Sequence, residues 1–130
     1  MVNHSTIDGC KKPLKKKVEP GLSSHSIETA FAYNIRPLLD FAAKSIPPES
    51  HNFTSVFILA TAGMRLLTEE KQQDIYRALK EEIRKNYNFQ LRDSDVVTIT
   101  GQEEAEYNWV AINYALGNLY MKSNPTNNAT

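Results

Sequence analysis

The chain has 130 residues, 41% of them hydrophobic, which suffices for one buried core but not for two complete domains. Fifteen Lys and Arg balance fifteen Asp and Glu, so the formal net charge is zero. That balance excludes the strongly basic surface typical of nucleic-acid binding, and we expect no nucleic-acid partner. No apolar run in the sequence approaches the ~18 residues of a membrane-spanning helix, and the N-terminus lacks the apolar stretch of a signal peptide.

Residues 1–17 are polar, rich in lysine and without periodicity, which predicts a disordered lead. The lysine cluster fits either a localisation or polyanion-binding patch or a solvated lead-in to the first folded element, and the lead-in is favoured. Cys10 is the only cysteine, so the sequence encodes no intramolecular disulfide that would indicate a compartment. Glycosylation sequons at Asn3, Asn52 and Asn128 favour a lumenal or extracellular protein only slightly.

The first folded element is predicted to be helical. Apolar residues recur at helical spacing from Ile27 to Ala42, after a turn signal at Pro20-Gly21. Pro37 interrupts this pattern, so we expect either a kink or two short helices meeting there. Pro47 and Pro48 should end the element.

Two strands and two further helices follow. Residues 55–60 form a compact apolar run typical of a strand buried on both faces of a parallel sheet. Thr68 is a good N-cap for an amphipathic helix reaching about Asn86, with Ile75, Leu79 and Ile83 on its apolar stripe.

Residues 96–100 predict a second strand, again ending at a glycine, Gly101. The helix after it should carry Trp109, Ile112 and Leu116 on one face and stop near Gly117. The order helix, strand, helix, strand, helix predicts an α/β fold with a parallel or mixed sheet flanked by helices. We expect one partial domain over residues 18–121 and a loop-like tail over 122–130.

Both predicted strands end in small, polar, glycine-containing turns, which is where open α/β sheets bind their ligands. Thr61 and Arg65 lie in or next to the first turn, and Glu103 and Glu104 follow the second. A hydroxyl, a guanidinium and a carboxylate in one cleft would suit a phosphate and a water. The structural alternative is that Thr61 caps a turn, Arg65 pairs on the surface, and the glutamates simply favour the start of a helix.

The two turns also carry a specific resemblance. The segment ATAGMRLL at residues 60–67 is nearly identical to the second signature of the apyrase family, the ectonucleoside triphosphate diphosphohydrolases and their Golgi nucleoside diphosphatase relatives. ITGQEE at residues 99–104, continuing through Tyr107, Trp109 and residues 113–117, resembles the third signature. Pro20-Gly21-Leu22-Ser23 is also similar. The resemblance spans about residues 15–120 with its order preserved.

The resemblance implies part of one ribonuclease-H-like half of an actin-like ATPase fold, with nucleotide bound between the two halves. It implies hydrolysis of the terminal phosphate of nucleoside di- or triphosphates (UDP, GDP or ATP), assisted by Ca²⁺ or Mg²⁺. Glu104 would be the general base, and Thr61 would hold the water shell of the metal or the nucleophile. Arg65 would brace the loop and Trp109 would pack below the site. No side chain of this chain is assigned as a direct metal ligand. Glu103, Glu106 and Glu69 inherit no catalytic role.

The family resemblance also implies a Golgi or other endomembrane lumen, or the cell surface, with membrane anchoring in the full-length protein. The stretch at residues 36–40 and the shortage of cysteines favour the Golgi type and its diphosphate substrates.

The sequence departs from the family in two respects. Ala105 stands where the family usually has glycine, and its methyl group would crowd a turn that required close backbone approach or positive φ. No Asp-x-Gly-Ser-Ser-type loop precedes residue 20 and no Asp-x-Gly-Gly-type loop follows residue 120, although these loops normally grip the phosphates. We therefore expect the isolated chain to be inactive and to be a fragment of a longer enzyme.

Two alternatives stay open from the sequence. One is a non-catalytic remnant or binding protein of the same family, favoured by Ala105 and the missing loops. The other is a different actin-like ATPase, such as a sugar kinase or an exopolyphosphatase, against which the two signature segments argue.

Overall fold

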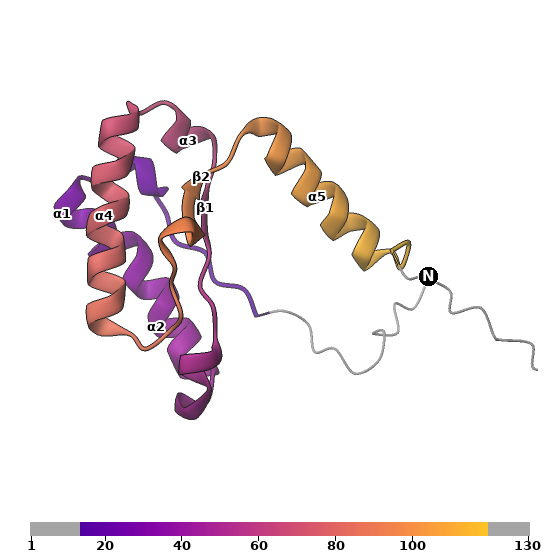
Figure 1. The fold of residues 1–130 in the computed structure, drawn as a ribbon, viewed down its shortest axis with the longest axis horizontal. Helices are drawn as coiled ribbons and strands as arrows, with labels where there is room; N and C mark the ends of the chain where they lie inside the picture. The colour runs from indigo at the N-terminus through magenta and orange to yellow at the C-terminus, as the bar shows by residue number, and fades with distance from the viewer. Residues whose placement is uncertain (1–13, 120–130) are drawn as a thin grey trace, which may run out of the picture.

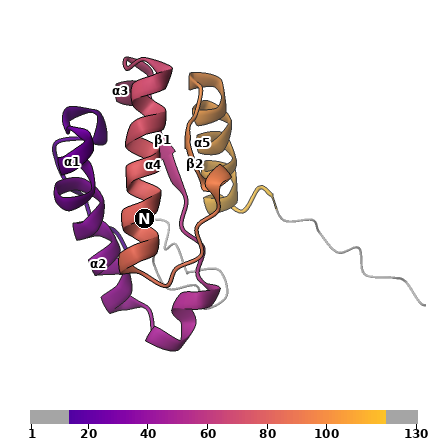
Figure 2. The same ribbon diagram turned by 60° about the vertical axis from the view of Figure 1, so that its left-hand side comes forward.

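The computed structural model describes residues 14–119, which form helices on both sides of a small sheet (Figure 1). The elements in chain order are a 3-10 turn (Leu22–Ser24), α1 (Ile27–Ala30), a π-helical segment (Phe31–Ile35), α2 (Arg36–Ser45), a 3-10 segment (Pro48–Phe53), β1 (Ile58–Ala60), α3 (Ala62–Arg65), α4 (Glu69–Asn86), a 3-10 turn (Asp93–Asp95), β2 (Val96–Thr98) and α5 (Gly101–Ala115). Figures 1 and 2 both place the strands between α4 and α5. The predicted α/β class is confirmed.

The predicted interruption near Pro37 is confirmed and takes the form of a π-helical segment. The chain stays helical from α1 through α2, but the Arg36 N–H bonds the Phe31 carbonyl, five residues back. Proline has no N–H, and its ring clashes with the carbonyl four residues earlier, here that of Tyr33. The wider π turn accommodates that ring at the start of α2. The helix ends at Ser45, before Pro47, as predicted.

The two strands are parallel, as predicted, with Ile58 opposite Val96 and Ala60 opposite Thr98. The expectation that the first strand is buried on both faces is wrong for the described residues. Leu59 and its partner Val97 are 47% and 40% exposed, whereas Ala60 is buried. Side chains alternate between the faces of a strand, and within residues 14–119 only the face toward α4 is covered.

Helix α4 forms the centre of the core. Thr68 caps its N-terminus by accepting a hydrogen bond from the Lys71 N–H, and Ile75, Leu79 and Ile83 are buried, all as predicted. The helix is tied to β2 by the Tyr76 hydroxyl, which lies 2.5 Å from Oγ1 of Thr98. This packing fixes the sheet against one helical layer and so positions the turns after β1 and β2.

Helix α5 forms from local signals but packs little. Its capping box pairs Thr100 with Glu103, and Gly117 follows the helix with φ of 75°, so the predicted start and stop are confirmed. Its predicted apolar face is exposed, however, with Trp109 at 60% and Ile112 at 58%. No residue of α5 is buried. Within the described part of the chain nothing covers this face.

Only some of the predicted domain limits fall within the described residues. Residues 1–13 and 120–130 lie outside the described residues, so the tail over 122–130 and most of the lead over 1–17 stay predictions. Residues 14–17 are exposed and without regular structure. Among the residues that the structure describes, no helix is long and apolar enough to cross a membrane.

Candidate functional site

The turns that follow β1 and β2 lie side by side because the two strands are parallel and in register. The Ile99 N–H donates to the Ala60 carbonyl at 2.9 Å, which extends the pairing to the start of both turns. The first turn leads into α3 and the second into α5. This edge is the carboxyl end of the sheet, where ligands bind in open α/β folds.

Arg65 joins the two turns. Its Nη1 donates to the Ile99 carbonyl at 2.7 Å, and its Nη2 lies 3.3 Å from Oε2 of Glu104. The Arg65 and Glu104 side chains are 33% and 38% exposed. Two candidate residues separated by 39 positions are thus brought into contact, and one of them also binds the backbone that precedes the other.

The acidic residues at the start of α5 have different partners. Glu103 accepts hydrogen bonds from the Thr100 N–H at 2.8 Å and the Thr100 hydroxyl at 3.0 Å. The Thr100 backbone bond, followed by the hydroxyl bond, lowers the pKa of the Glu103 carboxyl. Glu106 accepts from the Gln102 side chain at 2.9 Å. Glu103 therefore serves as a helix cap, which leaves Glu104 as the carboxylate held across the two turns.

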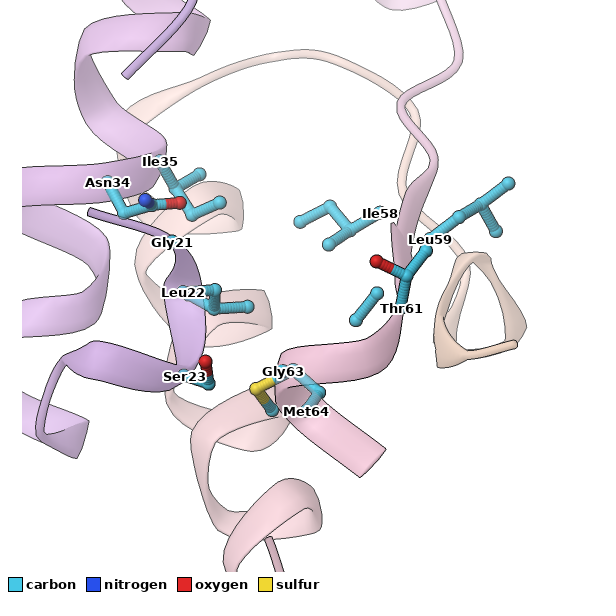
Figure 3. A pocket seen from close by; sticks show the side chains of 11 residues that line it. Gly21, Leu22, Ser23, Asn34, Ile35, Ile58, Leu59, Thr61, Gly63 and Met64 are labelled. Atoms are coloured by element: carbon cyan, nitrogen blue, oxygen red, sulfur yellow. The ribbon is translucent and has the colours of Figure 1, made fainter. Parts of the chain in front are cut away.

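Thr61 lines a cavity that Glu104 does not line. The cavity measures ≈ 270 Å³ and lies between β1 with its following turn and the segment around Gly21–Ser23. Figure 3 shows Thr61 on the β1 side and Asn34 on the helical side. The Thr61 carbonyl accepts from the Arg65 N–H at 3.3 Å, but no side-chain hydrogen bond joins Thr61 to Glu104 among the described residues.

The segment Pro20-Gly21-Leu22-Ser23 packs directly against the first turn. A Cβ atom at Gly63 would lie 2.5 Å from Oγ of Ser23, so the glycine allows this close approach. Asn34 anchors the segment by donating from Nδ2 to the Pro20 carbonyl at 2.8 Å, and it is only 7% exposed. Neither Asn34 nor this contact is predicted from the sequence, where a polar residue within an apolar helical stripe is the only available signal.

Trp109 is 60% exposed on α5. Its expected packing below the site is not seen within residues 14–119, and its supporting role stays a prediction.

Ala105 does not crowd a turn, which corrects the expectation from the sequence. It lies inside the first turns of α5 and is exposed. Alanine also favours a helix more than glycine does, by about 1 kcal/mol in helix propensity. The methyl group next to Glu104 therefore favours the helix that carries Glu104.

The donors at the carboxyl end are of the kind that calcium and magnesium bind, namely a hydroxyl at Thr61 and a carboxylate at Glu104. Among the described residues, however, no three His, Cys, Asp or Glu side chains gather closely enough to hold an ion. The chemistry of these donors fits a hydrated cation held mainly by other groups, and it does not form a complete protein cage.

The sequence matches the GDA1/CD39 (nucleoside phosphatase) family over residues 3–130. It is 40% identical over 107 residues to the nucleoside-diphosphatase mig-23 of Caenorhabditis elegans, covering 82% of this chain and 19% of that protein. It is 41% identical over 112 residues to ectonucleoside triphosphate diphosphohydrolase 4 of Mus musculus, covering 85% of this chain and 18% of that protein. The chain thus spans about a fifth of the length of the curated relatives that it matches. With both signature segments in place at the carboxyl end of its sheet, the chain belongs to the GDA1/CD39 (nucleoside phosphatase) family.

Proposed function

We propose that the protein containing this chain hydrolyses the terminal phosphate of nucleoside di- or triphosphates, with Glu104 as the general base. The observation that carries the proposal is the placement of the Glu104 carboxylate. It stands on the first turn of α5, at the carboxyl end of two parallel strands, and Arg65 binds one of its oxygens. The family match and the names of the relatives, a nucleoside-diphosphatase and a triphosphate diphosphohydrolase, support the substrate class.

In the proposed reaction, Glu104 accepts a proton from a water molecule placed in line with the terminal phosphorus. The water oxygen forms a bond to phosphorus while the bridging P–O bond breaks, and that electron pair leaves on the nucleotide product. The products are inorganic phosphate and a nucleotide shortened by one phosphate, with the proton on Glu104. Glu103 is instead held to the N-cap of its own helix, because the Thr100 N–H and hydroxyl both donate to its Oε2.

We include calcium or magnesium as the cofactor, because the family resemblance implies it and the oxygen donors fit. When bound, the cation would neutralise charge on the phosphate chain. Thr61 would contact its water shell or the attacking water from the cavity side of β1. Arg65 and Trp109 would support the loops rather than touch substrate.

We propose that the substrate is UDP or GDP, with ATP as the second choice. We propose that the protein lies in a Golgi or other endomembrane lumen, with the cell surface as the second choice. The resemblance of residues 36–40 to Golgi-type relatives supports the diphosphates. Asn52 of the sequon at residues 52–54 is exposed in the segment Pro48–Phe53, which leaves it accessible to glycosylation. Membrane anchoring in the full-length protein also remains a proposal.

We expect the 130-residue chain alone to be inactive, because its sequence lacks the two phosphate-gripping loops of the family. A test therefore needs a complete scaffold. We define the chimaera as the Caenorhabditis elegans nucleoside-diphosphatase mig-23 in which the 107 matching residues are replaced by those of this chain.

The test is phosphate release from UDP, GDP and ATP with calcium by the chimaera, its Glu104→Gln variant and the chain alone. We expect release from UDP or GDP by the chimaera, a loss of about 10²-fold or more in Glu104→Gln, and none from the chain alone. Equal activity of the chimaera and Glu104→Gln would remove Glu104 from its proposed role. Activity of the chain alone would contradict the expected dependence on the missing loops.

A second candidate is a non-catalytic remnant of the family that binds a partner. The exposed, helical position of Ala105 no longer favours it. An inactive chimaera that melts as one folded unit would support this candidate over the hydrolase.

A further inference from the structure

The structure assigns Arg65 a specific task, which rests on the proposed function: it is the positioning residue that fixes which oxygen of Glu104 takes the proton from water. This goes beyond bracing the loop. The guanidinium binds Oε2 of Glu104 through both Nη1, at 3.4 Å, and Nη2, at 3.3 Å. Among the described residues no other group hydrogen-bonds the Glu104 carboxylate, so Oε1 is the oxygen left to accept the proton.

The Ile99 carbonyl makes this orientation firm. Arg65 Nη1 donates to that carbonyl at 2.7 Å, the shortest of its three bonds. Ile99 directly precedes Thr100, the N-cap of α5, so the guanidinium is fixed to the same turn that carries Glu104. A planar guanidinium held at two points has little freedom to rotate, and it passes that restriction to the carboxylate.

The same bonds argue against direct contact of Arg65 with substrate. Two of its nitrogens already bind protein oxygens, and the side chain is one-third exposed. Loss of Arg65 should therefore lower the rate of the chemical step and leave substrate binding unchanged. A misplacement of about 1 Å in a reacting group costs about 10²-fold in rate.

The chain offers a matched control in Arg84. Its Nη2 also donates to one backbone carbonyl, that of Leu91 at 3.1 Å, and to one carboxylate, that of Asp93 at 2.9 Å. These partners precede β2, at the opposite end of the sheet. A variant of Arg84 therefore removes the same kind of bridge without touching the proposed site.

The experiment measures kcat and KM for UDP with calcium in the chimaera carrying Arg65→Ala, Arg65→Lys or Arg84→Ala, with thermal unfolding recorded for each. We expect Arg65→Ala to lower kcat about 10²-fold with KM within about threefold. Lysine keeps the charge but not the planar fork, so Arg65→Lys should recover only part of the loss. Arg84→Ala should keep kcat within about twofold, because a residue remote from the chemistry contributes little to kcat.

Chemical rescue separates positioning from folding. Added guanidinium at millimolar concentration should raise kcat of Arg65→Ala several-fold by binding Glu104 and the Ile99 carbonyl, and it should leave Arg84→Ala unchanged. In the Glu104→Gln background, Arg65→Ala should lower kcat by less than about twofold, because the two residues act as one unit.

The outcomes keep the two proposals apart. If Glu104→Gln abolishes activity while Arg65→Ala keeps its kcat, the positioning role is overturned and the proposed function stands. If Arg65→Ala raises KM with kcat unchanged, Arg65 binds substrate and the positioning role is also overturned. If kcat falls but neither guanidinium nor lysine restores any of it, and the loss follows the folded fraction, Arg65 is only structural. Full activity of Glu104→Gln would instead contradict the proposed function itself.

Discussion

The two ends of the sheet carry the same local chemistry with different surroundings. At the carboxyl end, Arg65 binds the Ile99 carbonyl and Glu104; at the amino end, Arg84 binds the Leu91 carbonyl and Asp93. Asp93 is also bound by Lys80 at 3.3 Å, so two cations share it. Glu104 is bound by one cation, Arg65.

Under the proposed function, this difference separates a structural carboxylate from a catalytic one. The Arg84 and Lys80 hydrogen bonds lower the pKa of the Asp93 carboxyl, and its charge serves to fasten the link between α4 and β2. Glu104 lies where parallel strands end and two glycine-containing turns meet, which is the usual place for a ligand in such sheets. An arginine bridge alone therefore does not indicate a site; the end of the sheet at which the bridge lies does.

The largest expected effect separates the two carboxylates. In the chimaera, Glu104→Gln should lower kcat for UDP by about 10²–10⁴-fold, whereas Asp93→Asn should leave it within about twofold. Steady-state phosphate release measures both. A comparable loss in both variants would show that the two ends of the sheet are equivalent and would break the comparison.

The second effect concerns the glycines of the carboxyl end. Gly63→Ala should destabilise the folded chimaera by about 1 kcal/mol, because the added methyl group meets Oγ of Ser23 and that side chain must shift. Gly101→Ala meets no atom within 4 Å and should be neutral or slightly stabilising. Thermal unfolding of the chimaera measures the pair, and Ser23→Gly should restore the stability of Gly63→Ala. Equal melting temperatures for the two alanine variants would contradict the packing of the segment around Ser23 on this turn.

A third, smaller effect lies at the amino end and appears at high pH. Burial, then the hydrogen bond to Asp40, raises the pKa of Tyr87 to about 12. The folded state therefore favours the neutral phenol. This stabilisation is complete below the ordinary pKa of about 10 and is lost as the pH rises toward 12. Unfolding midpoints between pH 9 and 12 should fall more steeply for the chimaera than for its Tyr87→Phe variant, and parallel curves would count against this contact.

The smallest effect compares two exposed carboxylates at low pH. The pKa of Asp93 is lowered by its Arg84 bond first, and that of Glu103 by its Thr100 backbone bond first. Each contributes stability that is present above its ordinary pKa and lost as the pH falls below it. Asp93→Asn and Glu103→Gln should each flatten the acid side of the stability curve slightly. The Asp93 effect should weaken with added salt more than the Glu103 effect, which depends on hydrogen bonds to the backbone and a hydroxyl.

Much of the fold follows from local patterns in the sequence. Thr68 and the apolar residues Ile75, Leu79 and Ile83 predict α4 because a cap and a helical stripe depend only on neighbours in the chain. The glycine turns after both strands are predictable for the same reason. The sequence could not predict that the apolar face of α5 is exposed here, because exposure depends on which partners are present.

In the candidate site too, the sequence predicts which residues take part but not which tertiary contacts they make. Family resemblance predicts roles for Glu104, Thr61 and Arg65, but it does not predict that Arg65 binds the Glu104 carboxylate while Thr61 lines a separate cavity. The Arg65 and Glu104 positions are 39 apart, and their contact depends on the register of β1 against β2. The close approach of Ser23 to Gly63 depends on tertiary packing in the same way.

The most direct test of the central claim is a crystal structure of the chimaera with calcium and a non-hydrolysable UDP analogue. We predict a water molecule in line with the terminal phosphorus, with Glu104 Oε1 about 2.6–3.2 Å from its oxygen and Arg65 still on Oε2. A Glu104 carboxylate turned away from the nucleotide, with another residue holding that water, would contradict the account.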